Sequence, residues 1–182
     1  MPMNGWIQIA LYSVIIIVIT KPFGGYLTRV FNGERTLLSP VFRPLERALY
    51  GISGVDEKEE QHWVTYGVAM LFFSLAGFVS LYVLQRFQDV LPFNPQNFSA
   101  VGQDLAFNTA MSFVTNANWQ SYVPETTMSY LVQMAGLTVH NLVSAATAIA
   151  ISVALVRGFA RGSATSIGHR WSDLRRSTTH LL

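Results

Sequence analysis

The run Thr115-Asn116-Ala117-Asn118 contains the residues of this sequence best suited to hold an ion. If the chain leaves a helix just before this run, the free backbone carbonyls become natural ligands for a dehydrated cation. The side chains of Thr115 and Asn118 would add two more oxygen ligands. Hard cations prefer oxygen, and the run has no carboxylate, so it suits a weakly held monovalent cation better than Ca²⁺ or Mg²⁺.

The residues on either side of this run would support such a site. The stretch from Asp104 to Phe113 is compatible with a helix that ends near Val114, but it is too short to span a membrane. If this helix dips into the membrane, the partial negative charge of its carboxyl end favours a cation there. We expect Trp119 to pack behind the loop and Gln120 to offer an amide dipole near its mouth. The alternative is a surface helix on the outer leaflet, followed by an ordinary polar loop.

The elements around this loop are those of a membrane protein. Only 12% of the residues are charged, against about 25% in soluble domains. Three long stretches carry no charge and are predicted as spanning helices, at residues 1–20, 63–84 and 130–156. The first has no basic region before it and no evident cleavage site, so we interpret it as a retained helix rather than a signal peptide. The predicted fold is all-α, with three transmembrane helices and one re-entrant pore helix and loop.

Basic residues predict how these helices are oriented. Residues 21–62 hold six Lys and Arg, residues 85–129 hold one, and residues 157–182 hold five. Positive charge favours the cytoplasmic side, which places the N-terminus outside, the loop of residues 85–129 outside and the basic tail of residues 157–182 in the cytoplasm.

Several other classes of function are not supported by the composition. The chain has no cysteine, which excludes disulfides, thiolate metal sites and cysteine nucleophiles. A net charge of +2, spread along the chain, does not indicate a nucleic-acid partner. There is no glycine-rich phosphate loop, so the chain itself is not expected to bind ATP or to be an enzyme.

Three further features of the sequence concern helices, and two of them have more than one interpretation. Residues 38–52 form either an interfacial amphipathic helix or a soluble segment packed on other subunits. Trp171 stands near the start of another possible amphipathic helix in the tail. His140 either lines an aqueous path or is a neutral histidine bonded between helices, which we favour. It belongs to a line of small and polar residues, spaced by four, that is typical of a helix-packing face: Gly136, His140, Ser144, Ala148 and Ser152.

The pore-loop residues also resemble a known family. Asn108-Thr109-Ala110, followed by the run from Ser112 to Gln120, is similar to the first pore loop of the KdpA family, the potassium-binding subunits of the Kdp potassium-transporting ATPases. The similarity covers essentially the whole chain and continues at residues 21–24, 125–130, 133–141 and 156–161.

This resemblance implies a potassium-binding and translocating subunit of an ATP-driven K⁺ uptake complex in the bacterial inner membrane. Repeated helix–pore loop–helix units would surround a filter in which the Thr115–Asn118 carbonyls bind K⁺. Asn116 would stand where potassium channels have a filter glycine. Val114 and Trp119 would support the filter, and Gln120 would influence ion selectivity. A separate P-type ATPase subunit would bind and hydrolyse ATP, small accessory subunits would complete the complex, and lipid would surround the spans.

Two features depart from the family pattern. Ala117 stands where the family commonly has threonine, which removes a hydroxyl but keeps the carbonyl. The chain also holds one pore unit where the family has four, so we expect an N-terminal fragment, or a chain that assembles with further copies. Two alternative functions remain: a passive K⁺ channel or symporter subunit of the same superfamily, and a membrane assembly subunit without an ion path.

Overall fold

The computed structural model describes residues 3–34, 60–162 and 165–181. The predicted amphipathic helix at residues 38–52 lies outside these ranges. The chain divides into two units, residues 1–49 and 50–182, and each is described by itself. Every named element in the described ranges is a helix.

The first unit contains helix α1, Met3–Phe31. The prediction ended this helix at residue 20, but it continues for eleven residues through Lys21 and Pro22. Hydroxyl groups along it bond to carbonyls of the preceding turn, including Thr20 Oγ1 to Ile16 O at 2.7 Å. Such local bonds satisfy hydroxyl groups within an otherwise largely apolar helix.

Helix α1 ends at a glycine in the left-handed region. Gly33 has φ 74°, a conformation that costs glycine little. Its N–H donates to Val30 O at 3.1 Å, and the N–H of Glu34 donates to Arg29 O at 2.9 Å. These two bonds form a Schellman motif, which satisfies the last carbonyls of the helix and stops it.

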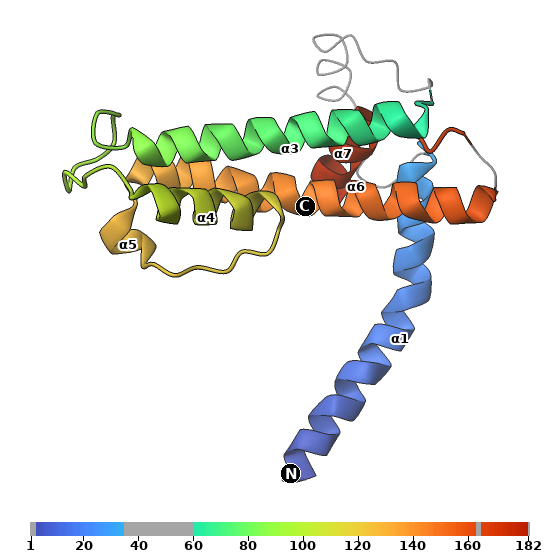
Figure 1. The fold of residues 1–182 in the computed structure, drawn as a ribbon. Helices are drawn as coiled ribbons and strands as arrows, with labels where there is room; N and C mark the ends of the chain where they lie inside the picture. The colour runs from blue at the N-terminus through green and yellow to red at the C-terminus, as the bar shows by residue number, and fades with distance from the viewer. Residues whose placement is uncertain (1–2, 35–59, 163–164, 182) are drawn as a thin grey trace. The chain divides into compact units, whose positions relative to one another are not determined.

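The second unit is built on two long antiparallel helices (Figure 1). Helix α3, Trp63–Arg86, is followed by the short helix α4, Gln103–Val114, and by α5, Pro124–Thr127. The return segment begins as a π-helix, η1, Val132–Thr138, and continues as α6, Val139–Arg161. Helix α4 packs against both α3 and α6, and α7, Arg170–His180, packs against α6 and α3.

Three helices are long and apolar enough to cross a membrane. In the described ranges they comprise Asn4–Phe31, Trp63–Arg86 and Val132–Arg161. Each exceeds the roughly 20 residues that a bilayer requires. The all-α membrane fold predicted from the apolar stretches is therefore confirmed.

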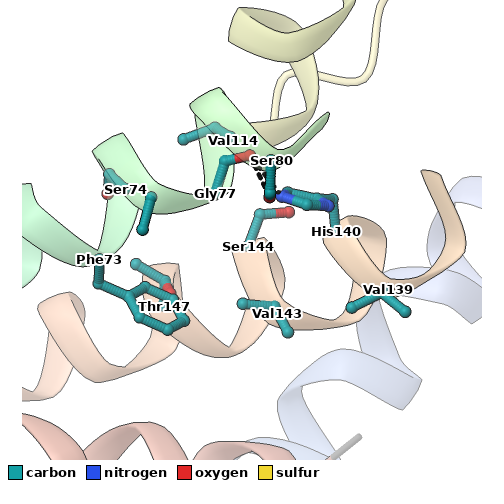
Figure 2. Close-up of a pocket in the computed structure, with 11 residues that line it drawn as sticks. Phe73, Ser74, Gly77, Ser80, Val114, Val139, His140, Val143, Ser144 and Thr147 are labelled. Carbon is teal, nitrogen blue, oxygen red and sulfur yellow. Dashed lines mark hydrogen bonds between the residues drawn. The ribbon is translucent and has the colours of Figure 1, made fainter. Parts of the chain in front are cut away.

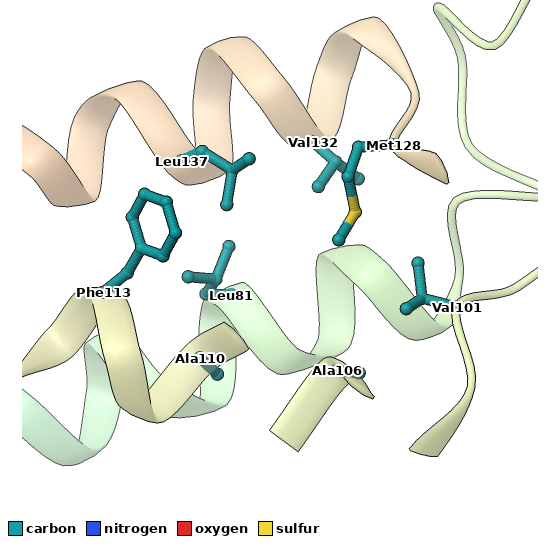
Figure 3. Packing of buried hydrophobic residues seen from close by; sticks show 8 residues of the cluster. All are labelled: Leu81, Val101, Ala106, Ala110, Phe113, Met128, Val132 and Leu137. Atoms are coloured by element: carbon teal, nitrogen blue, oxygen red, sulfur yellow. The ribbon is translucent and has the colours of Figure 1, made fainter. Parts of the chain in front are cut away.

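A buried cluster joins α3, α4 and η1 (Figure 3). Ala106 and Ala110 lie one turn apart on α4 and are fully buried, so the backbone of α4 can come close to α3. Phe113 is 2% exposed at the carboxyl end of α4. The cluster consists of Leu81, Val101, Ala106, Ala110, Phe113, Met128, Val132 and Leu137. It fixes the end of α4 to the rest of the unit.

The π-helix η1 packs closely against α3. A Cβ added to Gly136 would come within 2.8 Å of Leu81 Cδ1, so a side chain at this position would force the buried Leu81 side chain to shift. Thr138 Oγ1 donates to Gln133 O, five residues earlier, at 2.9 Å. The widened turn was not predicted, and such turns are frequent near functional sites.

Buried glutamines hold the loop between α3 and α4. Gln88 is fully buried, and its Nε2 donates to the carbonyls of Ser99 at 2.7 Å and Thr127 at 3.0 Å. Its Oε1 accepts from the N–H of Ser129 at 2.9 Å. Buried polar groups need such partners, and here they connect the segments before and after α4.

The segment 157–182 contains a packed helix. Helix α7 begins at Arg170, close to the Trp171 start that was predicted. Asp173 is 1% exposed and pairs with Arg157 of α6 at 2.7 Å. Burial raises the pKa of Asp173, and Arg157 opposes that rise. The Arg170 guanidinium is buried over the Phe73 ring, with its carbon 5.2 Å from the ring centroid. The tail is therefore attached to both long helices.

Candidate functional site

Helix α4 ends at Val114, where the sequence predicted its end. The chain does not continue as a helix through residues 115–120. The Thr115 hydroxyl donates to Met111 O at 2.7 Å, so its hydrogen is used to close the helix end while its oxygen keeps acceptor capacity. The non-helical loop that the pore-loop hypothesis requires is therefore present.

The backbone N–H groups of the loop all point back to α4. Thr115 N donates to Met111 O at 3.0 Å, and Asn116 N to Phe113 O at 3.2 Å. Ala117 N and Asn118 N both donate to Ser112 O, at 3.0 and 3.2 Å. Among the described residues, no donor is recorded for the carbonyl oxygens of residues 115–118. The loop thus uses its donors internally and leaves its acceptors available.

Two asparagines of the loop have left-handed backbone. Asn116 has φ 58° and Asn118 has φ 54°, while Ala117 between them does not have positive φ. Asparagine tolerates this region better than most residues. Glycine adopts this conformation without cost. The conformation therefore agrees with the expectation that Asn116 stands where potassium channels have a filter glycine. A change of handedness at every second residue also alters the direction of successive carbonyls.

Side chains from two helices support this loop. Ser144 Oγ, on α6, donates to Asn116 Oδ1 at 3.2 Å, and Asn118 Nδ2 approaches the same oxygen at 3.5 Å. Ser112 Oγ, on α4, donates to Trp119 O at 2.9 Å. These contacts hold both ends of the loop.

The predicted supporting residues Val114, Trp119 and Gln120 differ in their burial and contacts. Val114 is half-buried, whereas residues 115–120 are all exposed. The Trp119 side chain is 52% exposed, so the expected packing of its ring behind the loop is not seen; its carbonyl is held instead. Gln120 Nε2 donates to the Tyr122 hydroxyl at 3.3 Å. Burial raises the pKa of Tyr122, so this hydroxyl stays neutral beside the loop.

A cavity of about 400 Å³ lies between α3 and α6 next to the loop (Figure 2). Val114, His140 and Ser144 are among its lining residues. His140 Nε2 lies 2.9 Å from Gly77 O of α3, and Nδ1 lies 2.9 Å from Gly136 O of η1. A neutral ring has one N–H and can donate to only one of these carbonyls. The ring thus lies between helices, in agreement with the interpretation that the sequence favoured, and it also lines the cavity.

Comparison with known proteins decides the family. The sequence profile of the KdpA family, the potassium-transporting ATPase A subunit, matches residues 10–182. The chain belongs to this family. The resemblance of the chain to this family is therefore confirmed.

Curated KdpA relatives align with the whole chain. It is 60% identical to a protein of Rhizobium rhizogenes, 61% to one of Brucella anthropi and 62% to one of Mesorhizobium japonicum, each over 182 residues. Each is named potassium-transporting ATPase potassium-binding subunit. The alignments cover 100% of this chain and 32% of each relative, so the chain spans about a third of their length.

Two supporting residues of this KdpA chain were not singled out from the sequence as parts of the site. Ser144 was interpreted only as one of a line of packing residues, and Ser112 only as the start of the motif. Their partners, Asn116 and Trp119, are 28 and 7 residues away. Ser144 is one of several polar residues in its span, among them His140, Asn141 and Thr147, so polarity alone did not single it out.

Proposed function

We propose that this chain provides the first pore loop of a potassium-binding subunit in an ATP-driven K⁺ uptake complex. The carbonyls of Thr115, Asn116, Ala117 and Asn118 are the proposed K⁺ ligands. Val114, Trp119 and Gln120 are the proposed supporting residues. The observation that carries this proposal is that all four loop N–H groups donate to the end of α4 while the carbonyls have no recorded donor in the described chain. Filters that replace an ion's hydration shell are built from such carbonyls.

Helix α4 adds to the preference for a cation. Its carboxyl end meets the loop, and a helix carries a partial negative charge at that end. Four exposed residues on one side of an ion supply only part of a coordination shell. The complete filter would thus need loops from a family-length subunit or from further copies of the chain.

The proposed setting is a bacterial inner membrane. The distribution of Lys and Arg supports an external N-terminus and pore loop and a cytoplasmic α7. The relatives' name supports an ATPase with further subunits; the partners we propose are an ATP-hydrolysing P-type subunit and small accessory subunits. In this arrangement the present chain binds no ATP, and its transmembrane helices contact lipid.

The test uses a family-length subunit that carries this sequence, assembled with its ATPase partner. Valine at position 116 is disfavoured at φ 58° because it is β-branched. We expect Asn116→Val to raise the K⁺ concentration for half-maximal ATPase stimulation by at least tenfold, or to abolish stimulation. Asn97→Val is the matched control, since Asn97 has φ 54° in the loop before α4.

The outcome separates the candidate functions. Equal effects of the two substitutions on K⁺ stimulation would contradict a filter role for the loop. A passive channel or symporter subunit, the alternative within the superfamily, predicts K⁺ flux that persists without the ATPase partner and without ATP.

A further inference from the structure

The Ser144 hydroxyl does not bond to the backbone of its own helix, as several other serine and threonine hydroxyls of this chain do. Ser13, Thr20 and Ser152 each donate to the carbonyl four residues earlier in their own helix, at 2.8, 2.7 and 2.9 Å. This local bond is the usual way to satisfy a helical hydroxyl. Ser144 instead donates across to Asn116 Oδ1 at 3.2 Å, although it is only 5% exposed.

The acceptor of this bond is the residue whose backbone most needs support. Asn116 has φ 58°, and its carbonyl belongs to the loop. Asn118, the second left-handed residue, reaches the same oxygen with Nδ2 at 3.5 Å. The Asn116 amide oxygen therefore connects both left-handed residues of the loop to α6.

We propose that Ser144 is a positioning residue that sets the direction of the Asn116 carbonyl and thereby the cation preference of the loop. This inference rests on the proposed function, because it assigns a determinant of selectivity to the same site. The contact is with a side chain of the loop, so Ser144 acts through Asn116 and does not need to touch the ion.

His140 connects the part of α6 that carries Ser144 to α3. It lies one turn before Ser144 on α6, and its ring bonds to Gly77 O of α3 at 2.9 Å (Figure 2). A Cβ on Gly77 would stand 3.1 Å from His140 Nε2, so glycine permits this close approach. The buried cluster fixes α4 to α3 as well. Helix α6 and helix α4, which carries the loop, thus both pack against α3. This shared neighbour brings Ser144 and Asn116 together.

The Ser144 hydroxyl makes the shorter of the two side-chain contacts to Asn116 Oδ1, at 3.2 Å against 3.5 Å for Asn118 Nδ2. Ser144 also lines the space of about 400 Å³, so a methyl group left in place of its hydroxymethyl would border that space. Asn116 would then gain rotational freedom. Discrimination among monovalent cations depends on where carbonyls stand and how far they yield, so selectivity should fall with the loss of this bond.

The experiment compares Ser144→Ala with Ser144→Thr in the family-length subunit within its complex. ATPase stimulation is measured against K⁺, Rb⁺ and Na⁺ separately. We expect Ser144→Ala to raise half-saturation for K⁺ by about fivefold, the effect of one ordinary hydrogen bond, with a smaller change for Na⁺. The maximal rate should be unchanged. Ser144→Thr should restore the wild-type values, because it keeps the hydroxyl and the cavity has room for a methyl group.

Ser152→Ala is the matched control. Ser152 is an exposed serine of the same helix whose hydroxyl bonds to its own helix, so its removal should leave every half-saturation unchanged. Unchanged cation preference in Ser144→Ala would overturn the proposal. So would a lower maximal rate with an unaltered K⁺ to Na⁺ ratio, which would indicate only a packing role.

A second variant keeps the proposal testable if Ser144→Ala does not assemble. Asn116→Gly preserves the left-handed backbone but deletes the acceptor, so it should reproduce the loss of selectivity. An unaltered cation preference in Asn116→Gly would contradict the proposal. Where Ser144→Ala does assemble, adding it to Asn116→Gly should cause no further loss, and an additive effect would contradict the coupling. If the wild-type complex showed no stimulation by K⁺, the proposed function itself would fail, which is a separate result.

Discussion

The hydroxyl of Ser112 and the carbonyl of Trp119 are joined by a 2.9 Å hydrogen bond that returns the pore loop to the helix it leaves. The carbonyl of Ser112 also accepts from Ala117 N and Asn118 N. Ser112 is 1% exposed. One buried serine thus contacts the middle and the far end of the loop.

Replacing Ser112 with alanine should loosen the far end of the loop. The lost hydrogen bond is worth about 1 kcal/mol, and we expect the K⁺ half-saturation of the assembled complex to rise by about fivefold. Ser121→Ala, an exposed serine beyond the loop, is the control and should have no effect. Equal K⁺ half-saturation in Ser112→Ala and wild type would show that the Trp119 carbonyl needs no anchor.

Arginine at position 120 should weaken K⁺ binding. Gln120 is exposed two residues after Asn118, and a fixed positive charge there would repel the ion. At an effective dielectric constant of about 20, two unit charges ~6 Å apart interact by roughly 3 kcal/mol, which is about a hundredfold in affinity before screening. The measurement is half-saturation of K⁺-stimulated ATPase activity.

Gln96→Arg provides a matched control for that substitution. Gln96 is also exposed, and its Nε2 donates to a tyrosine hydroxyl, that of Tyr130, at the same 3.3 Å as the bond from Gln120 to Tyr122. The control adds an equal charge and removes an equivalent bond outside the pore loop. If both variants behaved alike, proximity of Gln120 to the ion path would be ruled out.

Threonine at position 117 should be tolerated. Ala117→Thr introduces the residue that the resemblance implies at this position and keeps the backbone carbonyl. Ala117 does not have positive φ, so a β-branched residue meets no left-handed strain. We expect unchanged or lower half-saturation for K⁺ in the same assay. A marked rise would mean that the space around Ala117 is matched to a methyl group.

Alanine at position 136 should destabilise the helical unit. The added Cβ would meet Leu81 Cδ1 at 2.8 Å, and overpacking of this kind typically costs about 1–3 kcal/mol. Thermal unfolding in detergent should show a lower midpoint. Gly158→Ala on α6 is the control, because nothing lies within 4 Å of its added Cβ. A normal midpoint for Gly136→Ala would indicate that η1 and α3 can separate freely.

The spans and the end of α4 were predictable because each depends on local features of the sequence. Uninterrupted apolar length predicted spans at residues 63–84 and 130–156, and the corresponding helical segments are Trp63–Arg86 and Val132–Arg161, the second made of η1 and α6. The polar residues after Val114 indicated where α4 stops. The length of α1 was not predicted, because Lys21 and Pro22 ordinarily mark a boundary and the local hydroxyl bonds that accompany the longer helix are not evident from composition.

The contacts that support the loop depend on tertiary structure. The bond from Ser144 to Asn116 joins residues 28 positions apart, and no periodicity encodes it. The π-helical turn at η1 lies where Gly136 approaches Leu81, and only the packing reveals this proximity. The burial of Asp173 beside Arg157 was likewise invisible in a tail that was interpreted from its charge.

The inward direction of the four loop N–H groups also bears on chloride. The backbone N–H groups of residues 115–118, which could otherwise solvate an anion, are already bonded to α4. In the proposed pore, rejection of halides would then rest on the main-chain hydrogen bonds of the loop.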